Sequence, residues 1–136
     1  MKKYIIGVDL GGTNIRAGLV LGNKIIKKAE VKTEVSKGKN IVIKNLVKAI
    51  SSVMTNNVAG IGIGSPGPLN YKKGIIINSP NLPFRNTNLK KILKREFNVH
   101  VLIDNDANCF TLGEALYGSG KKHNCVIGLT IGTGVG

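Results

Sequence analysis

Three short apolar segments, separated by glycine turns, constrain the fold more than any other feature of this chain. They cover residues 4–10, 14–21 and 24–33, with turns at Gly11-Gly12 and Gly22-Asn23. Apolar runs of this length that are bounded by turn residues predict strands, and strands joined by such short turns pair antiparallel. The first part of the chain is therefore predicted to be a three-stranded antiparallel meander.

The rest of the sequence alternates between helical and strand patterns. Helices are predicted over residues 39–55, over 86–97 with an Asn or Thr cap, and over 105–120 with an end at Gly118 and Gly120; strands are predicted over 58–66, 99–104 and 124–136, the last running into a glycine turn. Residues 66–86 hold all four prolines and are expected to be a long functional or disordered loop. This alternation predicts an α/β domain with a mixed sheet.

Length and composition suit one ordinary domain. The 136 residues are 42% hydrophobic but only 4% aromatic, so aliphatic side chains are expected to fill the core. No apolar run approaches the roughly 18 residues of a membrane span, and the N-terminus lacks the apolar region of a signal peptide. These patterns predict a soluble cytoplasmic protein without a membrane partner.

The net charge is +13, from 20 basic and 7 acidic residues. Such a charge invites a nucleic-acid interpretation, but the lysines are scattered and do not interleave with aromatic residues, so we expect a lysine-rich surface and no nucleic-acid partner. The charge would still attract anionic ligands. Cys109 and Cys125 lack metal-ligand spacing and are expected to be reduced and packed.

One glycine motif is discounted. Residues 62–67, GIGSPG, match the G-x-G-x-x-G dinucleotide fingerprint and follow a predicted strand. The fingerprint should open a helix and be followed by an acid about 20 residues later. Here the chain continues with Pro68, and no acid lies between Glu34 and Glu96.

Two other glycine segments resemble each other. VDLGGT (8–13) and LTIGTG (129–134) each run from an aliphatic strand into a turn of glycine and threonine. Backbone N–H groups in such turns form anion-binding nests, and glycine lets a ligand approach the backbone closely. Two ordinary hairpin turns are the alternative. The aspartate before the first turn and the presence of a second copy favour a polyphosphate held between them.

The chain has only seven acidic residues, so few carboxylates are available as catalytic groups or metal ligands. Glu30, Glu34 and Glu96 lie on lysine-rich surfaces, where solvated pairing is expected. Asp9 stands beside the first glycine turn, where it either shapes the turn or holds Mg²⁺ through water near a phosphate. Residues 104–108, DNDAN, hold more polar side chains than a helix cap needs and could bind a polyol, with one carboxylate accepting a proton as in phosphoryl transfer.

Five pieces in this order resemble the ROK family of sugar kinases and repressors, which belongs to the actin-like ATPase superfamily. They are residues 7–20, 60–70, 74–83, 105–120 and 129–136. The resemblance implies an α/β, ribonuclease H-like domain with a mixed β-sheet flanked by helices over residues 1–136. It also implies ATP and Mg²⁺ as cofactors and a hexose, glucose first, as the acceptor at its 6-hydroxyl.

The resemblance assigns roles residue by residue. Asp106 matches the catalytic base, and Asp9 matches the residue that holds Mg²⁺ through water. The positions matched to cofactor binding are Asp9, Gly11, Gly12, Thr13, Asn14, Gly132, Thr133, Gly134 and Gly136. The positions matched to substrate binding are Gly67, Asn81, Asn105 and Asp106.

Family members have two domains, and this sequence matches the first. Turnover is therefore expected to need a complementing C-terminal half, because half a cleft does not orient both substrates; a homo-oligomer is the other expected assembly. Two alternatives stay open. One is a ROK transcriptional regulator, which would carry a helix-turn-helix before residue 1, although Met1 leads straight into the first strand. The other is a noncatalytic sugar- or nucleotide-binding module.

Overall fold

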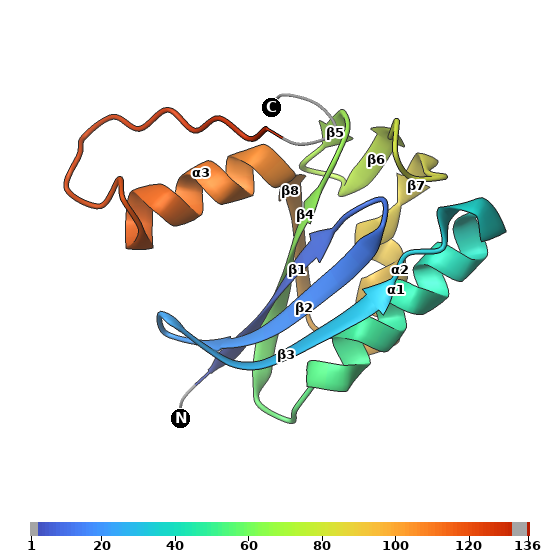
Figure 1. Ribbon diagram of the computed structural model, residues 1–136. Coiled ribbons are helices and arrows are strands. Elements are labelled where there is room, and N and C mark those ends of the chain that lie inside the picture. The colour runs from blue at the N-terminus through green and yellow to red at the C-terminus, as the bar shows by residue number, and fades with distance from the viewer. Residues whose placement is uncertain (1–2, 132–135) are drawn as a thin grey trace.

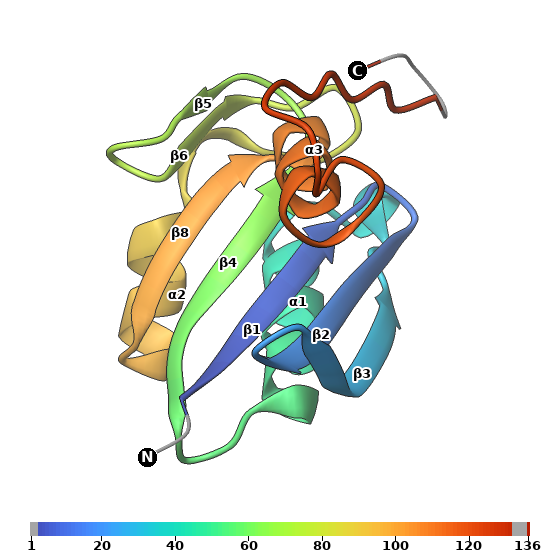
Figure 2. The ribbon, with the colours of Figure 1, turned by 90° about the vertical axis from the view of Figure 1, so that its left-hand side faces the viewer.

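The computed structural model describes residues 3–131 and 136 of the chain. A five-stranded sheet carries α1 (Lys39–Val53) and α2 (Leu89–Phe97) on one face, while α3 (Asp106–Tyr117) lies on the other side (Figures 1 and 2). The strands of this sheet are β1 (Tyr4–Leu10), β2 (Asn14–Leu21), β3 (Lys24–Lys32), β4 (Val58–Ser65) and β8 (His100–Asn105), in the order β3-β2-β1-β4-β8. The predicted mixed sheet flanked by helices is confirmed.

Strand directions place the chemistry at one edge. β1, β2 and β3 pair antiparallel, as the meander prediction requires, whereas β1 pairs parallel with β4, and β4 with β8. The carboxyl ends of β1, β4 and β8 therefore meet at the same edge of the sheet. In open α/β sheets this edge is where ligands bind.

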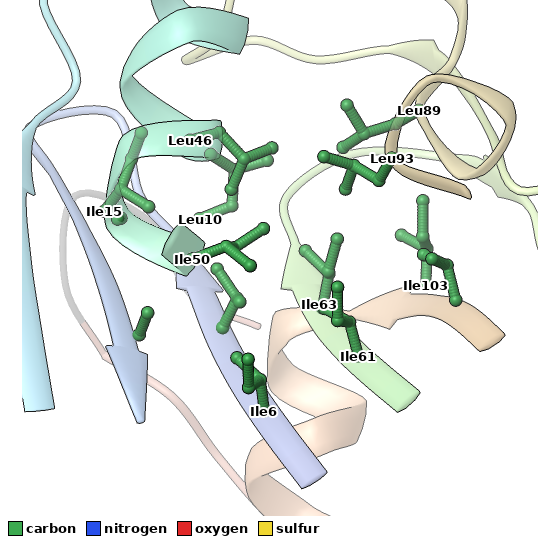
Figure 3. Close-up of a cluster of buried hydrophobic side chains, with 14 of the residues drawn as sticks. Ile6, Leu10, Ile15, Leu46, Ile50, Ile61, Ile63, Leu89, Leu93 and Ile103 are labelled. Carbon is green, nitrogen blue, oxygen red and sulfur yellow. The ribbon is translucent and has the colours of Figure 1, made fainter. Parts of the chain in front are cut away.

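The core lies between the sheet and the two helices α1 and α2, and aliphatic side chains dominate it (Figure 3). On β4, Ile61 and Ile63 enter the core, while the alternating glycines face the other side of the sheet. Each fully buried aliphatic side chain contributes about 1.5–3 kcal/mol relative to an exposed one. Among the largest fully buried side chains of the described residues, Phe84 alone is aromatic, which agrees with the composition.

The expectation of a long loop over residues 66–86 is wrong. Three short strands, β5 (Leu69–Asn70), β6 (Ile75–Asn78) and β7 (Arg85–Asn88), form a second antiparallel sheet there. Strands this short show no readable periodicity, so sequence patterns miss them. Because residues 85–88 pair as β7, α2 begins at Leu89 and not at residue 86; the Asn88 side chain caps it by accepting from the Lys91 N–H at 2.9 Å.

The strand predicted over residues 124–136 is also wrong within the described part. Residues 124–130 form no strand, and Ile131 makes an isolated bridge. Ile127 and Ile131 are 87% and 84% exposed, so these apolar side chains find no sheet partner among the described residues. Residues 132–135 lie outside the described residues.

Helix α3 is also exposed to solvent, so the expectation that the cysteines are packed is wrong. It buries none of its residues. Cys109 on α3 and Cys125 beyond it are free thiols, as expected, but both are exposed and not packed. No helix formed by the described residues is long and apolar enough to cross a membrane.

Candidate functional site

A cleft of about 920 Å³ lies between the open face of the β1–β3 meander and the start of α3. Asp9, Arg16, Glu30, Gly64 and Asp106 are among its lining residues. Two carboxylates that are far apart in the sequence, Asp9 and Asp106, thus share one cleft. Sequence reasoning had selected both of them.

Gly64 explains how α3 comes so close to the sheet. In the strand register, Asp9 of β1 stands beside Gly64 of β4, which stands beside Asp104 of β8. A Cβ at Gly64 would lie 3.4 Å from the Cα of Asp106 and 3.6 Å from the Sγ of Cys109. The missing side chain leaves room for the first turn of α3, which carries Asp106, directly against this row.

The electrostatics of the cleft centre on Asp9. Burial raises the pKa of the Asp9 carboxyl group, Arg16 opposes that shift, and the nearby charge of Asp106 adds to it. The Arg16 guanidinium lies 3.8 Å from the Asp9 carboxylate. Two carboxylates that repel each other in one cleft favour a cation between or beside them.

The start of α3 is built from the DNDAN segment. Asn105 caps the helix, and its Oδ1 accepts from the N–H groups of Ala107 and Asn108 at 3.0 and 3.2 Å. Asp104 Oδ1 accepts from the Asn108 side chain at 3.1 Å. Asp106 is the first helical residue, where the helix dipole favours a carboxylate. Much of the polar cluster therefore forms the cap, and Asp106 is the member that lines the cleft.

The first glycine turn is bonded to Thr33, the residue that follows β3. The Thr33 hydroxyl donates to the carbonyl oxygen of Gly11 at 2.7 Å, and the Thr33 N–H donates to that of Thr13 at 2.9 Å. Within the turn, the Gly11 N–H donates to the carbonyl oxygen of Asn14 at 3.1 Å. The Asn14 side chain has a buried Oδ1 without a hydrogen-bond partner among the described residues.

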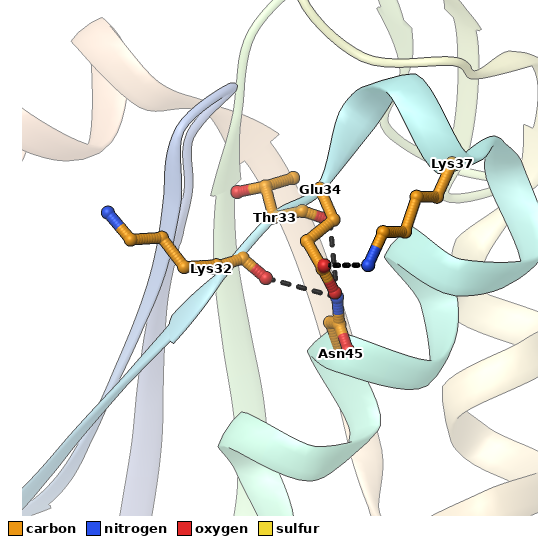
Figure 4. Close-up of polar contacts among 5 residues, drawn as sticks. All are labelled: Lys32, Thr33, Glu34, Lys37 and Asn45. Atoms are coloured by element: carbon orange, nitrogen blue, oxygen red, sulfur yellow. Dashed lines mark hydrogen bonds and ion pairs between the residues drawn. The ribbon is translucent and has the colours of Figure 1, made fainter.

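Helix α1 anchors the segment that holds this turn (Figure 4). The Asn45 side-chain amide donates to the carbonyl oxygens of Lys32 and Thr33 at 3.0 and 3.3 Å, and to the Glu34 carboxylate at 3.0 Å. Glu34 also pairs with Lys37. The hydrogen bonds from Lys37 and then Asn45 lower the pKa of Glu34. The glycine turn is thus tied through Thr33 to a buried helix.

The loops expected to bind sugar contact this turn. A Cβ at Gly12 would lie 3.0 Å from the carbonyl oxygen of Asn81. Gly67 has a φ of +94°, and a Cβ there would lie 2.2 Å from the carbonyl oxygen of Asn78, so the position requires glycine. The structure therefore places Gly12 and Asn81 side by side, with Gly67 packed on the same loop.

The second glycine segment is described only at its ends. Gly132, Thr133 and Gly134 lie outside the described residues. Gly136 exchanges two 2.9 Å backbone hydrogen bonds with Thr130, and a Cβ on it would lie 3.3 Å from the Cβ of Ala107. This end of the segment thus lies against the first turn of α3.

Sequence reasoning missed two residues of the cleft, Arg16 and Glu30. Arg16 stands opposite Asp9 on one side and opposite Glu30 on the other. Its Nε donates to the Glu30 carboxylate at 3.0 Å, and this hydrogen bond raises the pKa of Arg16. Glu30 was expected to pair on the surface, which it does. Strand register, once the turn lengths are known, is the signal that could have placed both residues beside Asp9.

Taken together, a mixed sheet flanked by helices, with an Asp-x-Gly-Gly-Thr hairpin on β1–β2 and an Asp at the start of a facing helix, has the architecture of the actin-like ATPase fold. A family model described as "ROK family" matches residues 5–136. The chain belongs to the ROK family.

Three relatives illustrate the range of this family. A glucokinase of Thermotoga maritima is 42% identical over 99% of this chain, and a xylose repressor of Caldicellulosiruptor bescii is 32% identical over 97% of it. The solved structure of a ROK family glucokinase from Streptomyces griseus, in complex with glucose and AMPPNP, matches 98% of the chain at 30% identity with a TM-score of 0.87. The matches span 44%, 35% and 43% of these relatives, respectively.

Proposed function

We propose that this chain is the N-terminal part of an ATP-dependent hexose kinase, which transfers the γ-phosphoryl group of ATP to the 6-hydroxyl of a hexose, glucose first. The observation that carries the proposal is the shared cleft of Asp9 and Asp106 beside the glycine turn of residues 11–13. Phosphoryl transfer needs a phosphate cradle, a carboxylate near the metal and a base for the acceptor hydroxyl. Asp9 and Asp106 line the cleft, and the glycine turn begins two residues after Asp9, which supports this assignment of the three parts.

Asp106 is the proposed catalytic base. It accepts the proton of the sugar 6-hydroxyl as that oxygen attacks the γ-phosphorus. Its position at the first residue of α3 fixes its backbone, since the Asn105 cap and the close contact with Gly64 leave that turn little freedom. The carboxylate lines the cleft, which leaves it accessible to a substrate hydroxyl.

The glycine turn and Asp9 form the proposed nucleotide side. The turn offers backbone N–H groups from Gly12 and Thr13, while its carbonyl oxygens at Gly11 and Thr13 are occupied by Thr33. Asn14 adds a buried side-chain amide whose Oδ1 lacks a partner among the described residues. The second glycine segment, Gly132, Thr133, Gly134 and Gly136, completes this cradle in the proposal.

Asp9 fits a magnesium site that is shared with a nucleotide. Mg²⁺ keeps several waters and is commonly held by one or two carboxylates together with substrate phosphates. Asp9 offers one carboxylate in the cleft, with Asp106 close enough to perturb its pKa. The ion, when bound, neutralises charge on the phosphate oxygens.

The proposed sugar side consists of Asn81, Asn105 and Gly67. Asn81 and Gly67 belong to the loops around the small β5–β7 sheet, which contact the glycine turn. Asn105 uses its side-chain oxygen for the helix cap, which orients its amide N–H₂ group as a donor for a sugar hydroxyl. In the proposal, these residues hold the acceptor with its 6-hydroxyl at Asp106.

The proposed active form contains more protein than this chain. Phe110, Leu112, Leu116 and Tyr117 on α3 are large apolar side chains that are 46% to 68% exposed. Apolar surface gathered in this way marks a contact with other protein. We propose that a complementing C-terminal half, or a second copy in a homo-oligomer, covers this side and closes the cleft over both substrates in a magnesium-dependent cytoplasmic enzyme.

A sugar-responsive transcriptional regulator is the second candidate. The similarity to the xylose repressor of C. bescii supports it. A regulator would bind sugar without transferring phosphate, so it needs no base at Asp106. The presence of both Asp106 and Asp9 in one cleft favours the kinase.

The test is phosphorylation of glucose with ATP and Mg²⁺. The assay uses this chain alone and then this chain joined to the part of the T. maritima glucokinase that follows the matched region. Activity only in the joined protein supports the proposed kinase and its need for a second half. Sugar binding without phosphoryl transfer, across several hexoses, favours the regulator or a binding module.

A further inference from the structure

Arg16 is held between two carboxylates in a row across three strands. Glu30 of β3, Arg16 of β2 and Asp9 of β1 are direct neighbours in the strand register. The Arg16 Nε donates to Glu30 at 3.0 Å, and the Arg16 Nη1 lies 3.8 Å from the Asp9 carboxylate. All three residues line the cleft that also holds Asp106.

The geometry divides the guanidinium into two working edges. The hydrogen bond from Nε to Glu30 fixes the orientation of the guanidinium. The Nη1 atom is thereby held beside Asp9. Arginine suits such a task because its planar guanidinium presents donors in a fixed fork. A lysine at the same position would reach one carboxylate or the other, but not both in fixed directions.

Folding stability does not account for this arrangement. The side chains of Arg16, Glu30 and Asp9 are each more than half exposed, at 60%, 53% and 58%. Ion pairs between such exposed groups contribute little to folding stability.

An anchor on Asp9 would exclude a conformation that aspartate commonly adopts just before a turn. An aspartate just before a turn readily accepts hydrogen bonds from the N–H groups two or three residues ahead. Here the Gly11 N–H already donates to Asn14, so the open group is the N–H of Gly12, which the proposed function reserves for phosphate. A cation on the opposite side of the carboxylate holds it away from the turn and toward the cleft.

We propose that Glu30 and Arg16 are positioning residues, which act in series to fix the carboxylate of Asp9 in the cleft before the nucleotide binds. This inference rests on the proposed kinase function and goes beyond it, since it gives roles to two residues that do not touch substrate. Glu30 acts only through Arg16, and Arg16 only through Asp9. The effects of substituting Glu30 and of substituting Arg16 are therefore expected to be non-additive.

The test uses Arg16→Gln, Arg16→Lys, Glu30→Gln and the double variant, each in the joined protein described above. Displacing a group of the active site by about 1 Å lowers turnover strongly. We expect kcat to fall about tenfold in Arg16→Gln and severalfold in Glu30→Gln, with KM for glucose within about twofold. Arg16→Lys should recover part of the loss, and the double variant should match Arg16→Gln.

An NMR measurement tests whether Glu30 and Asp9 hold the Arg16 guanidinium, and it does not depend on enzyme activity. In this chain, the NMR signal of the Arg16 Nε–H group should shift in Glu30→Gln and in Asp9→Asn. Lys28→Gln is the matched control, because Lys28 lines the same cleft from β3 and stands opposite Gly18. It removes a neighbouring positive charge and should leave the Arg16 Nε–H signal nearly unchanged.

The outcomes separate the two claims. An unmodified joined protein that phosphorylates no hexose overturns the proposed kinase function, and this inference falls with it. An active protein whose kcat is unchanged in Glu30→Gln overturns this inference alone. A rise in KM for ATP in Arg16→Gln, with Glu30→Gln like the unmodified protein, would make Arg16 a direct nucleotide contact and would also overturn it.

Discussion

The hydroxyl of Thr33, at the end of the β-meander, donates a 2.7 Å hydrogen bond to the carbonyl oxygen of Gly11 in the first glycine turn. Thr33 is completely buried, and its own backbone segment is bonded to Asn45 of α1. The turn proposed to bind phosphate is therefore shaped from the core side. Thr33 satisfies the carbonyl oxygens of Gly11 and Thr13, and the proposal leaves the N–H groups of Gly12 and Thr13 for a ligand.

Replacing Thr33 by Val tests this support. The change keeps the shape of the side chain but leaves the Gly11 carbonyl oxygen without its donor. Losing a partner of a buried polar group costs about 1–3 kcal/mol, so we expect a loss of that size in the free energy of unfolding, measured with urea. Thr33→Ser keeps the hydroxyl and should lose less. Equal stability of Thr33→Val and the unmodified chain would contradict the support.

Gly67 makes a second prediction, about conformation. Its φ is +94°, and a Cβ added at this position would clash with the Asn78 carbonyl oxygen. Gly67→Ala should therefore cost about 1–3 kcal/mol of unfolding free energy. Gly62→Ala is the matched control, because a Cβ at Gly62 meets nothing within 4 Å. A control that loses as much stability as Gly67→Ala would show that the loop conformation is not the cause.

Cys109 reports on the electrostatics of the cleft. Although Cys109 as a residue is exposed, its thiol lies against Gly64, and this partial burial raises the pKa of the thiol; the carboxylates of Asp104, Asp106 and Asp9 raise it further. Because the thiolate is the reactive form, Cys109 should react more slowly than free cysteine at pH 7.5. Its rate should reach half of the maximum at a pH above the ordinary thiol value of about 8.5.

The measurement is alkylation by iodoacetamide across pH 7–11 in Cys125→Ser, which leaves Cys109 as the one cysteine of the chain. Asp104→Asn in the same background removes a negative neighbour and should move the profile to lower pH. A profile of Cys109 at or below that of free cysteine would show that its carboxylate neighbours lie farther away than in the structure.

The exposed apolar side chains of α3 give a prediction about assembly. Leu112→Ser and Leu116→Ser change side chains that are 60% and 51% exposed, so the unfolding free energy of the chain alone should change by less than about 0.5 kcal/mol. The same pair of changes should weaken activity in the joined protein, where this side is proposed to be covered. Full activity there would show that α3 is not an interface.

Sequence patterns predicted the main sheet and helices because those elements are long enough to show their period. The alternation of isoleucine and glycine on β4, for example, predicts a strand with one face in the core. The β5–β7 sheet was missed because strands of two to four residues show no period. The strand over residues 124–136 was predicted from apolar content alone, which does not reveal whether a neighbouring strand is present.

The residues of the candidate site also fall into those that a local motif reveals and those that it does not. Asp9, Gly11, Gly12 and Asp106 stand in local motifs, so the sequence alone selected them. Arg16 and Glu30 act through cross-strand register, which no local pattern reveals. Asn105 was selected as a sugar contact, and the structure adds that its oxygen caps α3, a role that depends on where the helix begins.

The most direct measurement is the turnover and glucose affinity of Asp106→Asn in the joined protein, with Asp104→Asn as the matched control. Losing a general base should lower kcat by about 10²–10⁴-fold, while glucose binding, measured by calorimetry, stays within about threefold. Asp104→Asn keeps an oxygen that accepts from the Asn108 side chain and should retain most of the activity. Turnover of Asp106→Asn close to that of the unmodified protein would contradict the account.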